Sequence, residues 1–242
     1  MSSESAWSAL PRGPTLFGKL PQKRDFVRIR HDYPAALAFD SWLQDGLAEL
    51  ADSGLGYGDA RVRFLFAQED VSLVGILHAS RDRAGRAFPV SIFAPVPSVV
   101  VGADAATLWL ASGRFFADSE RVLATVANLA FDDLAIQLDG VATPSRDELA
   151  AVPKTDEVDL NLPSDEVALT DALDCPAPDF RRVADFCRVV QQARPRALSV
   201  FWALDGTREP GRALLCSPPA SPSLLARLTQ GASTQGSRWT RL

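Results

Sequence analysis

VSLVGILHASRDRAGRAFPVSIFAPV, residues 71–96, indicates the topology of the chain. Two apolar runs rich in Val and Ile flank the short polar segment RDRAG, and such runs are typical of β-strands. Gly85 supplies a residue that adopts positive φ without strain, as a tight turn between antiparallel strands requires. We therefore predict a β-hairpin with its tip at Arg81–Gly85.

The residues before this hairpin predict one helix and one further strand. Apolar residues recur at helical spacing from Pro34 to Ala51, Pro34 suits the first helical position, and Gly54 is expected to end the helix. RVRFLFA, residues 61–67, alternates with a period of two. It predicts a half-buried strand with three apolar residues on one face: Val62, Phe64 and Phe66.

Residues 104–138 have a helical pattern. We predict two helices, broken near Arg114–Asp118, with Ser119 capping the second. One apolar stripe is expected to form the buried face of that second helix: Leu123, Val126, Ala127, Ala130, Leu134 and Leu138.

The C-terminal part predicts a helix over 179–193, short strands at 197–204 and 212–217, and a small helix near 221–231. Strands and helices mix without a regular βαβ repeat. We therefore predict an α+β fold with a largely antiparallel sheet packed with helices. This is a layered α/β sandwich, and a longin- or profilin-like arrangement is one form of it.

The domain organisation follows from composition. Residues 1–14 are polar, with Ser, Pro and Gly, and are expected to form a flexible leader. Residues 15–242 are expected to form one domain. Residues 143–178 are rich in Asp, Glu and Pro and predict an acidic, partly mobile connection within that domain.

Composition also narrows the classes of partner. With 242 residues and 47% apolar side chains, the chain can bury a core, and its net charge of -5 provides no basic excess for nucleic acid. Because it has neither a secretory pattern nor about 18 uninterrupted apolar residues, we expect a cytoplasmic protein without membrane insertion. The spacing of Cys175, Cys187 and Cys216 predicts reduced, half-buried thiols.

Few residues suggest catalysis. His31 and His78 are the two histidines, and both are expected to be structural or surface residues. Acidic pairs such as Asp132 and Asp133 are typical of solvated faces. Phosphate-binding and nucleophile motifs are missing from the sequence. We therefore predict no catalytic site, no metal site and no cofactor.

Two locally basic segments stand out in this acidic chain: LFGKLPQKRDFVR, residues 16–28, and RDRAGR, residues 81–86. Either they bind a partner, or Asp25 and Asp82 cap their own turns or pair with nearby arginines while the other charges are solvated. Under the first interpretation the binding residues are Lys19, Arg24, Asp25, Arg28, Asp82, Arg83 and Arg86. Phe26 is expected to anchor the first turn in the core.

At these same segments the sequence resembles the TagF family, also called ImpM, of type VI secretion-associated proteins. FGKLPQKRDFVR matches a family turn of the form FGKLPxxGDFVR, and DRAGRAFP matches a DRVGRxFP hairpin. Ser41-Trp42-Leu43, ALSVFWAL and CSPPASPSLLARL match three further family motifs in order. Arg24 stands where the family usually has Gly, and a positive φ there would cost roughly 1 kcal/mol or more.

The resemblance implies a non-enzymatic accessory protein of a bacterial type VI secretion system. Family members are post-translational repressors in the cytoplasm that engage a forkhead-associated scaffold protein. Two alternatives remain open. One is an enzyme that binds a small molecule or phosphate at residues 18–28, used as an anion site. In the other, both motifs are architectural and the acidic segment Thr155–Asp174 binds the partner.

Overall fold

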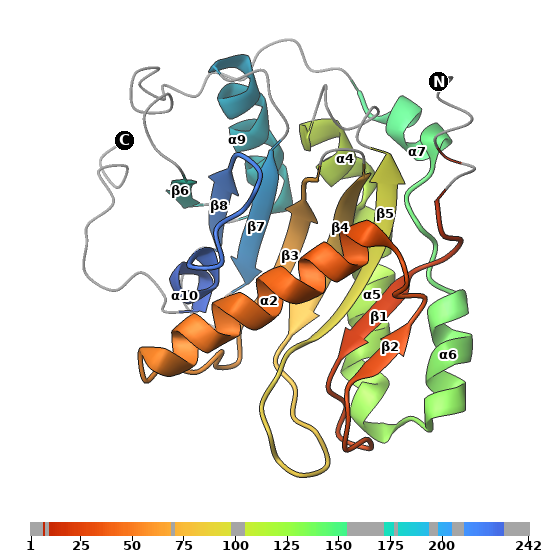
Figure 1. The fold of residues 1–242 in the computed structure, drawn as a ribbon. Helices are drawn as coiled ribbons and strands as arrows, with labels where there is room; N and C mark the ends of the chain where they lie inside the picture. Colours follow the sequence, from red (N-terminus) through yellow and green to blue (C-terminus); the bar gives the residue numbers. More distant parts are fainter. Residues whose placement is uncertain are drawn as a thin grey trace.

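The computed structural model describes residues 7, 10–68, 71–97, 105–153, 172–176, 179–193, 198–204 and 211–229. These residues form one antiparallel sheet of eight strands in the order β2-β1-β5-β4-β3-β7-β8-β6, with helices on both faces (Figure 1). The predicted α+β class is therefore confirmed. The strands are β1 (Thr15–Gly18), β2 (Val27–Ile29), β3 (Arg61–Phe66), β4 (Val71–His78), β5 (Val90–Pro97), β6 (Ala172–Pro176), β7 (Ser199–Leu204) and β8 (Arg212–Cys216).

The helices divide between the two faces of the sheet. α2 and α10 pack together on one face, and α4, α5 and α9 lie behind the other (Figure 1). The helices are α2 (Pro34–Asp52), α4 (Ala105–Ala111), α5 (Gly113–Thr125), α6 (Phe131–Asp139), α7 (Arg146–Ala151), α9 (Phe180–Ala193) and α10 (Leu224–Thr229), with a 3-10 turn at Val126–Asn128.

Alternation along the strands produces two hydrophobic cores, one on each face. In β5, Ile92 and Ala94 belong to the core with α4 and α5, whereas Phe93 belongs to the core with α2. Side chains of successive strand residues point to opposite faces, so one strand contributes to both cores. Full burial of an Ile or Phe side chain, such as Ile92 or Phe93, stabilises the fold by about 1.5–3 kcal/mol.

The predicted hairpin is confirmed. β4 and β5 are antiparallel with His78 opposite Val90, a further bridge joins Arg81 to Ala87, and Gly85 has a φ of 82°. The helix after the first turn also agrees: α2 begins at Pro34, and Gly54 follows its end with a φ of 70°.

The helix, strands and small helix predicted for the C-terminal part correspond to α9, β7, β8 and α10. No helix in the described ranges has the length and apolar content needed to cross a membrane.

The strand predicted at residues 61–67 is confirmed as β3, with Val62, Phe64 and Phe66 in one core, but the prediction that it is half-buried was wrong. β3 lies between β4 and β7, and both of its faces are covered. Leu65, on the face opposite Phe64, is fully buried in the α4–α5 core. Arg63 shares that face and donates two hydrogen bonds to Glu120 of α5, at 2.7 and 2.9 Å. Its guanidinium carbon also lies 5.3 Å from the ring centroid of Trp202.

The predicted helix break near Arg114–Asp118 was also wrong. α4 ends earlier, and Ser112 Oγ donates to the Leu108 carbonyl at 2.7 Å at the break. Ser119 is not a cap, because it lies buried inside α5. The stripe does not continue through Ala127 and Ala130, which are exposed, because the chain leaves the helix before α6 begins.

Parts of the segment expected to be a connection form regular structure. α7 begins with a capping box, in which Ser145 Oγ accepts from the Glu148 amide at 3.2 Å and Glu148 Oε2 accepts from the Ser145 amide at 2.9 Å. β6 extends the sheet beyond β8. Residues 154–171 and 177–178 lie outside the described residues, as does most of the leader 1–14.

The cysteines are more deeply buried than predicted. Cys187 on α9 and Cys216 on β8 are reduced cysteines buried in the two cores. Burial raises the pKa of the Cys216 thiol to about 12, which disfavours the reactive thiolate. The Cys175 side chain lies outside the described residues.

Candidate functional site

Two segments distant in sequence meet at one end of the sheet (Figure 1). We call them the paired turns: residues 19–26 between β1 and β2, and residues 80–89 between β4 and β5. The Arg83 amide donates to the Lys23 carbonyl at 2.8 Å, and Ser80 Oγ donates to the Lys19 carbonyl at 2.7 Å. These two basic sequence motifs are therefore one structural unit.

Gly18 allows the paired turns to approach closely. Its φ is 135°, a conformation that side chains with a Cβ rarely adopt. A Cβ at this position would lie 2.3 Å from the Pro89 carbonyl oxygen and 2.7 Å from Val90 Cα. Only glycine fits between the two backbones here.

The carboxylate of Asp82 lies at the centre of the paired turns and is only 4% exposed. Oδ1 accepts from the amides of Ala84 and Arg86, each at 2.9 Å. Oδ2 accepts from Arg86 Nε at 2.7 Å and lies 3.2 Å from Lys19 Nζ. Burial alone would raise the pKa of Asp82, but hydrogen bonds from Arg86, Lys19 and Ala84 lower it to about 2. The predicted capping role is confirmed for Asp82.

Three of the predicted basic residues have partners inside the protein. Lys19 is 8% exposed, pairs with Asp82, and lies 5.3 Å from the Phe26 ring centroid. Arg86 also donates to the Arg24 carbonyl. Arg28 Nη2 donates to Asp40 Oδ2 at 3.3 Å. Each of these cations thus has a carboxylate within 3.3 Å, and the Arg28 and Arg86 side chains are also 45% and 59% exposed.

Aromatic rings support the paired turns from inside. Phe26 stacks on Phe17 with ring centroids 5.7 Å apart and meets Phe88 edge-on at 4.6 Å. The Arg28 guanidinium lies over both Phe17 and Phe26, at 5.3 and 5.4 Å. The predicted anchoring of the turn by Phe26 is therefore confirmed.

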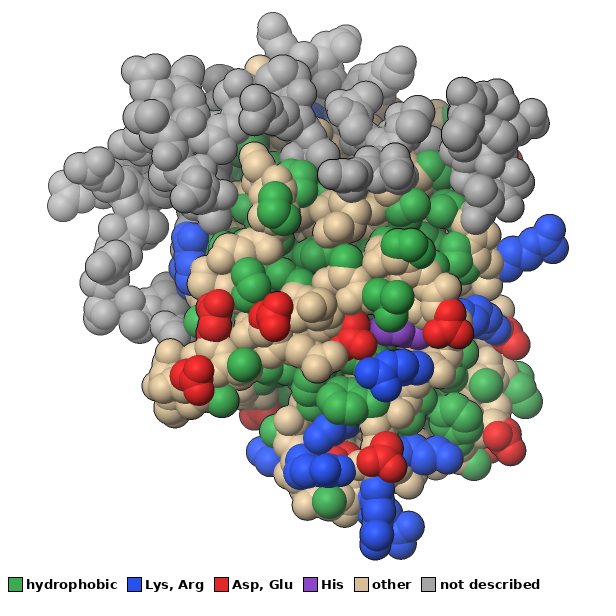
Figure 2. Space-filling view, viewed as in Figure 1, with side chains coloured by type: hydrophobic (Ala, Val, Ile, Leu, Met, Phe, Trp, Pro, Cys, Tyr) green, Lys and Arg blue, Asp and Glu red, His purple; other side chains and the backbone are tan. Residues whose placement is uncertain are grey.

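The remaining charges face solvent. Arg24, Asp25 and Arg83 are exposed and make no side-chain hydrogen bond or ion pair within the described residues, so Asp25 does not cap its turn as one interpretation predicted. Arg81 is exposed and has one long contact, 3.4 Å, with the Gly85 carbonyl. Lys and Arg side chains gather at this end of the molecule (Figure 2). We call Arg24, Arg81 and Arg83 the arginine tip.

The expected strain at Arg24 is absent. Arg30, with a φ of 53°, is the only non-glycine residue with positive φ among the described residues. It donates to the Pro14 carbonyl at 3.0 Å and pairs with Asp139 of α6. Arg24 therefore adds an outward charge to a turn that does not require a glycine at this position.

The sequence prediction missed Asp40 and Arg81. Asp40 is 7% exposed and lies on the buried side of α2, next to Phe39. The sequence could have indicated this residue, because a carboxylate among the apolar positions of an amphipathic helix needs a partner when it is buried. Arg81 lay within the quoted motif but was not assigned to the site.

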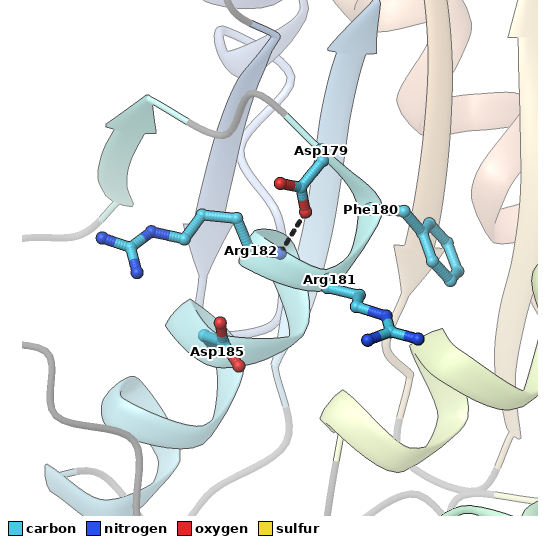
Figure 3. A pocket seen from close by; sticks show the side chains of 5 residues that line it. All are labelled: Asp179, Phe180, Arg181, Arg182 and Asp185. Carbon is cyan, nitrogen blue, oxygen red and sulfur yellow. Dashed lines mark hydrogen bonds between the residues drawn. The ribbon is translucent and has the colours of Figure 1, made fainter.

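A pocket of about 550 Å³ lies elsewhere, at the start of α9 (Figure 3). Its lining residues are Asp179, Phe180, Arg181, Arg182 and Asp185. Asp179 Oδ1 already accepts from the Arg182 amide at 2.9 Å, and the Arg181 and Arg182 side chains extend in opposite directions. None of these lining residues belongs to residues 18–28, where the alternative interpretation placed an anion site. Within the described ranges, no group of three His, Cys, Asp or Glu side chains is arranged to hold a metal ion.

Comparisons with known proteins identify relatives. The family model described as TagF N-terminal domain, type VI secretion system-associated, matches residues 15–141, just over half of the chain. The crystal structure of PA0076 from Pseudomonas aeruginosa PAO1 has a similar fold, with a TM-score of 0.59 and 21% identity over 90% of this chain and 94% of that chain. A search of curated proteins found no match.

Proposed function

We propose, since this chain belongs to the TagF family of type VI secretion system-associated proteins, that it is a non-enzymatic accessory protein whose arginine tip binds a partner protein. One observation carries this proposal. Arg24, Arg81 and Arg83 are exposed on the paired turns, while Lys19, Arg28 and Arg86 beside them are paired with Asp82 or Asp40. Arg24 and Arg83 have no side-chain partner among the described residues and Arg81 has one long contact, so these three arginines are available to an external anion.

The family resemblance supports a more specific form of the proposal. The partner is a forkhead-associated scaffold protein of the secretion system, and binding represses secretion in the cytoplasm after the components have been made. Arginine guanidinium groups form paired hydrogen bonds with carboxylates. The face of the scaffold that meets the arginine tip is accordingly acidic.

The environment of Lys19 favours this function over an enzyme with an anion site at residues 18–28. Lys19 is the base closest to the end of β1, and its ammonium is buried against Asp82. A phosphate there would have to displace the Asp82 carboxylate, which accepts three hydrogen bonds and also pairs with Lys19. Thermal-shift assays with inorganic phosphate and nucleotides should therefore leave the melting temperature unchanged. A saturating ligand, at about a hundred times its Kd, would instead add roughly 2.7 kcal/mol of stability.

The binding test replaces the arginine tip. We expect the variant with Arg24, Arg81 and Arg83 changed to Ala to bind the scaffold at least about tenfold more weakly, since one charge-assisted hydrogen bond contributes about 1.5–3 kcal/mol. Isothermal titration calorimetry measures the affinity, and a secretion assay measures repression.

The matched control changes the same number of exposed arginines elsewhere: Arg114, Arg121 and Arg146. This variant has the same net charge as the test variant and should bind like the wild type. Wild-type affinity in a folded arginine-tip variant would rule out the proposed surface.

A further inference from the structure

His31 is a buried histidine without a hydrogen-bond partner. It is 2% exposed, and neither ring nitrogen has a partner within the described residues. Its ring packs against Phe17 and Phe93, with centroids 4.9 and 6.5 Å away. Buried polar atoms are nearly always hydrogen-bonded in native proteins, so this exception calls for an explanation.

The carboxylate of Asp40 on α2 lies close to the ring of His31. His31 Nε2 lies 3.8 Å from Asp40 Oδ2, too far for a hydrogen bond. The same oxygen accepts from Arg28 Nη2 at 3.3 Å, and Oδ1 accepts from Gln44. One carboxylate oxygen thus faces two basic side chains, and only Arg28 is bonded to it.

The charged groups that face His31 come from three elements: Arg28 of β2, Asp40 of α2 and Asp32 of the turn between them. The neighbours from β1 and β5, Phe17 and Phe93, are uncharged. Burial lowers the pKa of His31 most, Asp40 raises it, Arg28 lowers it further, and Asp32 raises it. The net shift of the His31 pKa is downward, so burial and Arg28 together favour the neutral imidazole.

We propose that His31 and Arg28 compete for Oδ2 of Asp40, and that a proton on His31 displaces Arg28 from α2. The proton comes from solvent and is held on Nε2, which then donates to Oδ2. Arg28 leaves as an unchanged cation, and its side chain is already 45% exposed and can enter solvent. Two cations beside one carboxylate repel each other, so binding of one weakens binding of the other by the same free energy.

Arg28 connects this competition to the paired turns. Its guanidinium covers Phe17 and Phe26, the rings that support those turns. Protonation of His31 therefore changes the side of the turn next to the arginine tip. The effect on partner binding rests on the proposed function, whereas the competition itself does not.

The test is an NMR titration of the full chain. The protein has two histidines, so His78→Gln leaves His31 as the single imidazole. In this background we expect Arg28→Gln to raise the pKa of His31 and Asp40→Asn to lower it. The Arg28 guanidinium resonance should move with the same midpoint as the His31 ring.

The matched control is Arg24→Gln, which removes an exposed arginine of the same turn and should leave the His31 titration unchanged. The proposal is overturned if Arg28→Gln raises the pKa no more than Arg24→Gln does. It is also overturned if the chain unfolds before His31 gains a proton, because a folded, protonated state would then not exist.

A separate measurement connects the competition to binding. Scaffold affinity of the wild type should change across the His31 titration, and the affinity of His31→Gln should not follow that curve. If Arg28→Gln raises the pKa of His31 but scaffold affinity does not change with pH, His31 and Arg28 compete for Asp40 without any effect on partner binding. Failure to bind scaffold at any pH would reject the proposed function alone.

Discussion

The carboxylate of Asp82 accepts hydrogen bonds from two amides of its own turn and pairs with Lys19 and Arg86. The sequence revealed half of this arrangement, because an Asp at the start of a short turn is a common capping residue. Lys19 could not be identified as its partner, since the pairing depends on β1 lying beside β5. The proximity of Asp40 and His31 also could not be identified from the sequence, because it depends on the path of the turn after β2.

Replacing Asp82 tests the importance of this carboxylate. Asp82→Asn keeps the size of the side chain but leaves the buried Lys19 ammonium without its counter-ion. We expect a lower urea midpoint at pH 6 than in the wild type. Asp25→Asn, at an exposed residue of the facing turn, is the control and should have little effect.

The same variant should alter the dependence of stability on pH. The pKa of Asp82 is about 2 in the folded protein, below the value of about 3.9 in an unfolded chain. Its contribution is therefore fully present above about pH 4 and is lost as the pH falls through about 2. Urea midpoints of the wild type and Asp82→Asn should differ at pH 6 and converge near pH 2. A constant difference across this range would show that the charge is not responsible.

At the scale of elements, the reliable predictions were those that depended on local patterns. The β4–β5 hairpin was defined by its two apolar runs and Gly85, and α2 by its periodicity and Pro34. The burial of both faces of β3 depended on long-range packing. Nothing near Leu65 in the sequence indicates that a helix from residues 113–125 covers its face of the sheet.

Two glycines allow the contact between the paired turns to be tested. Gly18→Ala should destabilise the protein by about 3 kcal/mol or more, because a Cβ would strike the β5 backbone in addition to straining φ. At Gly85 φ is also positive, but no atom lies within 4 Å of an added Cβ. Gly85→Ala should therefore destabilise the protein by only about 1 kcal/mol. Urea denaturation measures both, and equal losses would argue against the close approach at Gly18.

At the scale of the whole molecule, the family-matched region and the rest of the chain share one sheet. Residues 15–141 supply β1 to β5, and β7 then pairs with β3 through five residue pairs. Arg63 of β3 also lies over Trp202 of β7. The sheet and both cores therefore continue across the end of the matched region.

A chain truncated after Val141 should expose this junction. β3 would become an edge strand with buried apolar residues on both faces, and such edges promote aggregation. We expect the fragment to aggregate on size-exclusion chromatography under conditions where the full chain gives a single peak. A well-folded monomeric fragment would show that the first five strands are stable alone.

The distance in sequence between the paired turns also bears on the order of folding. Ser80 and Lys19, which join them, are 61 residues apart, so this contact closes a long loop and forms late relative to local hairpins. The β4–β5 hairpin can form early, but the arginine tip acquires its geometry only after β1 has added to β5. A partner that recognises the arginine tip therefore binds chains in which β1 has paired with β5 in preference to chains in which only the β4–β5 hairpin has formed.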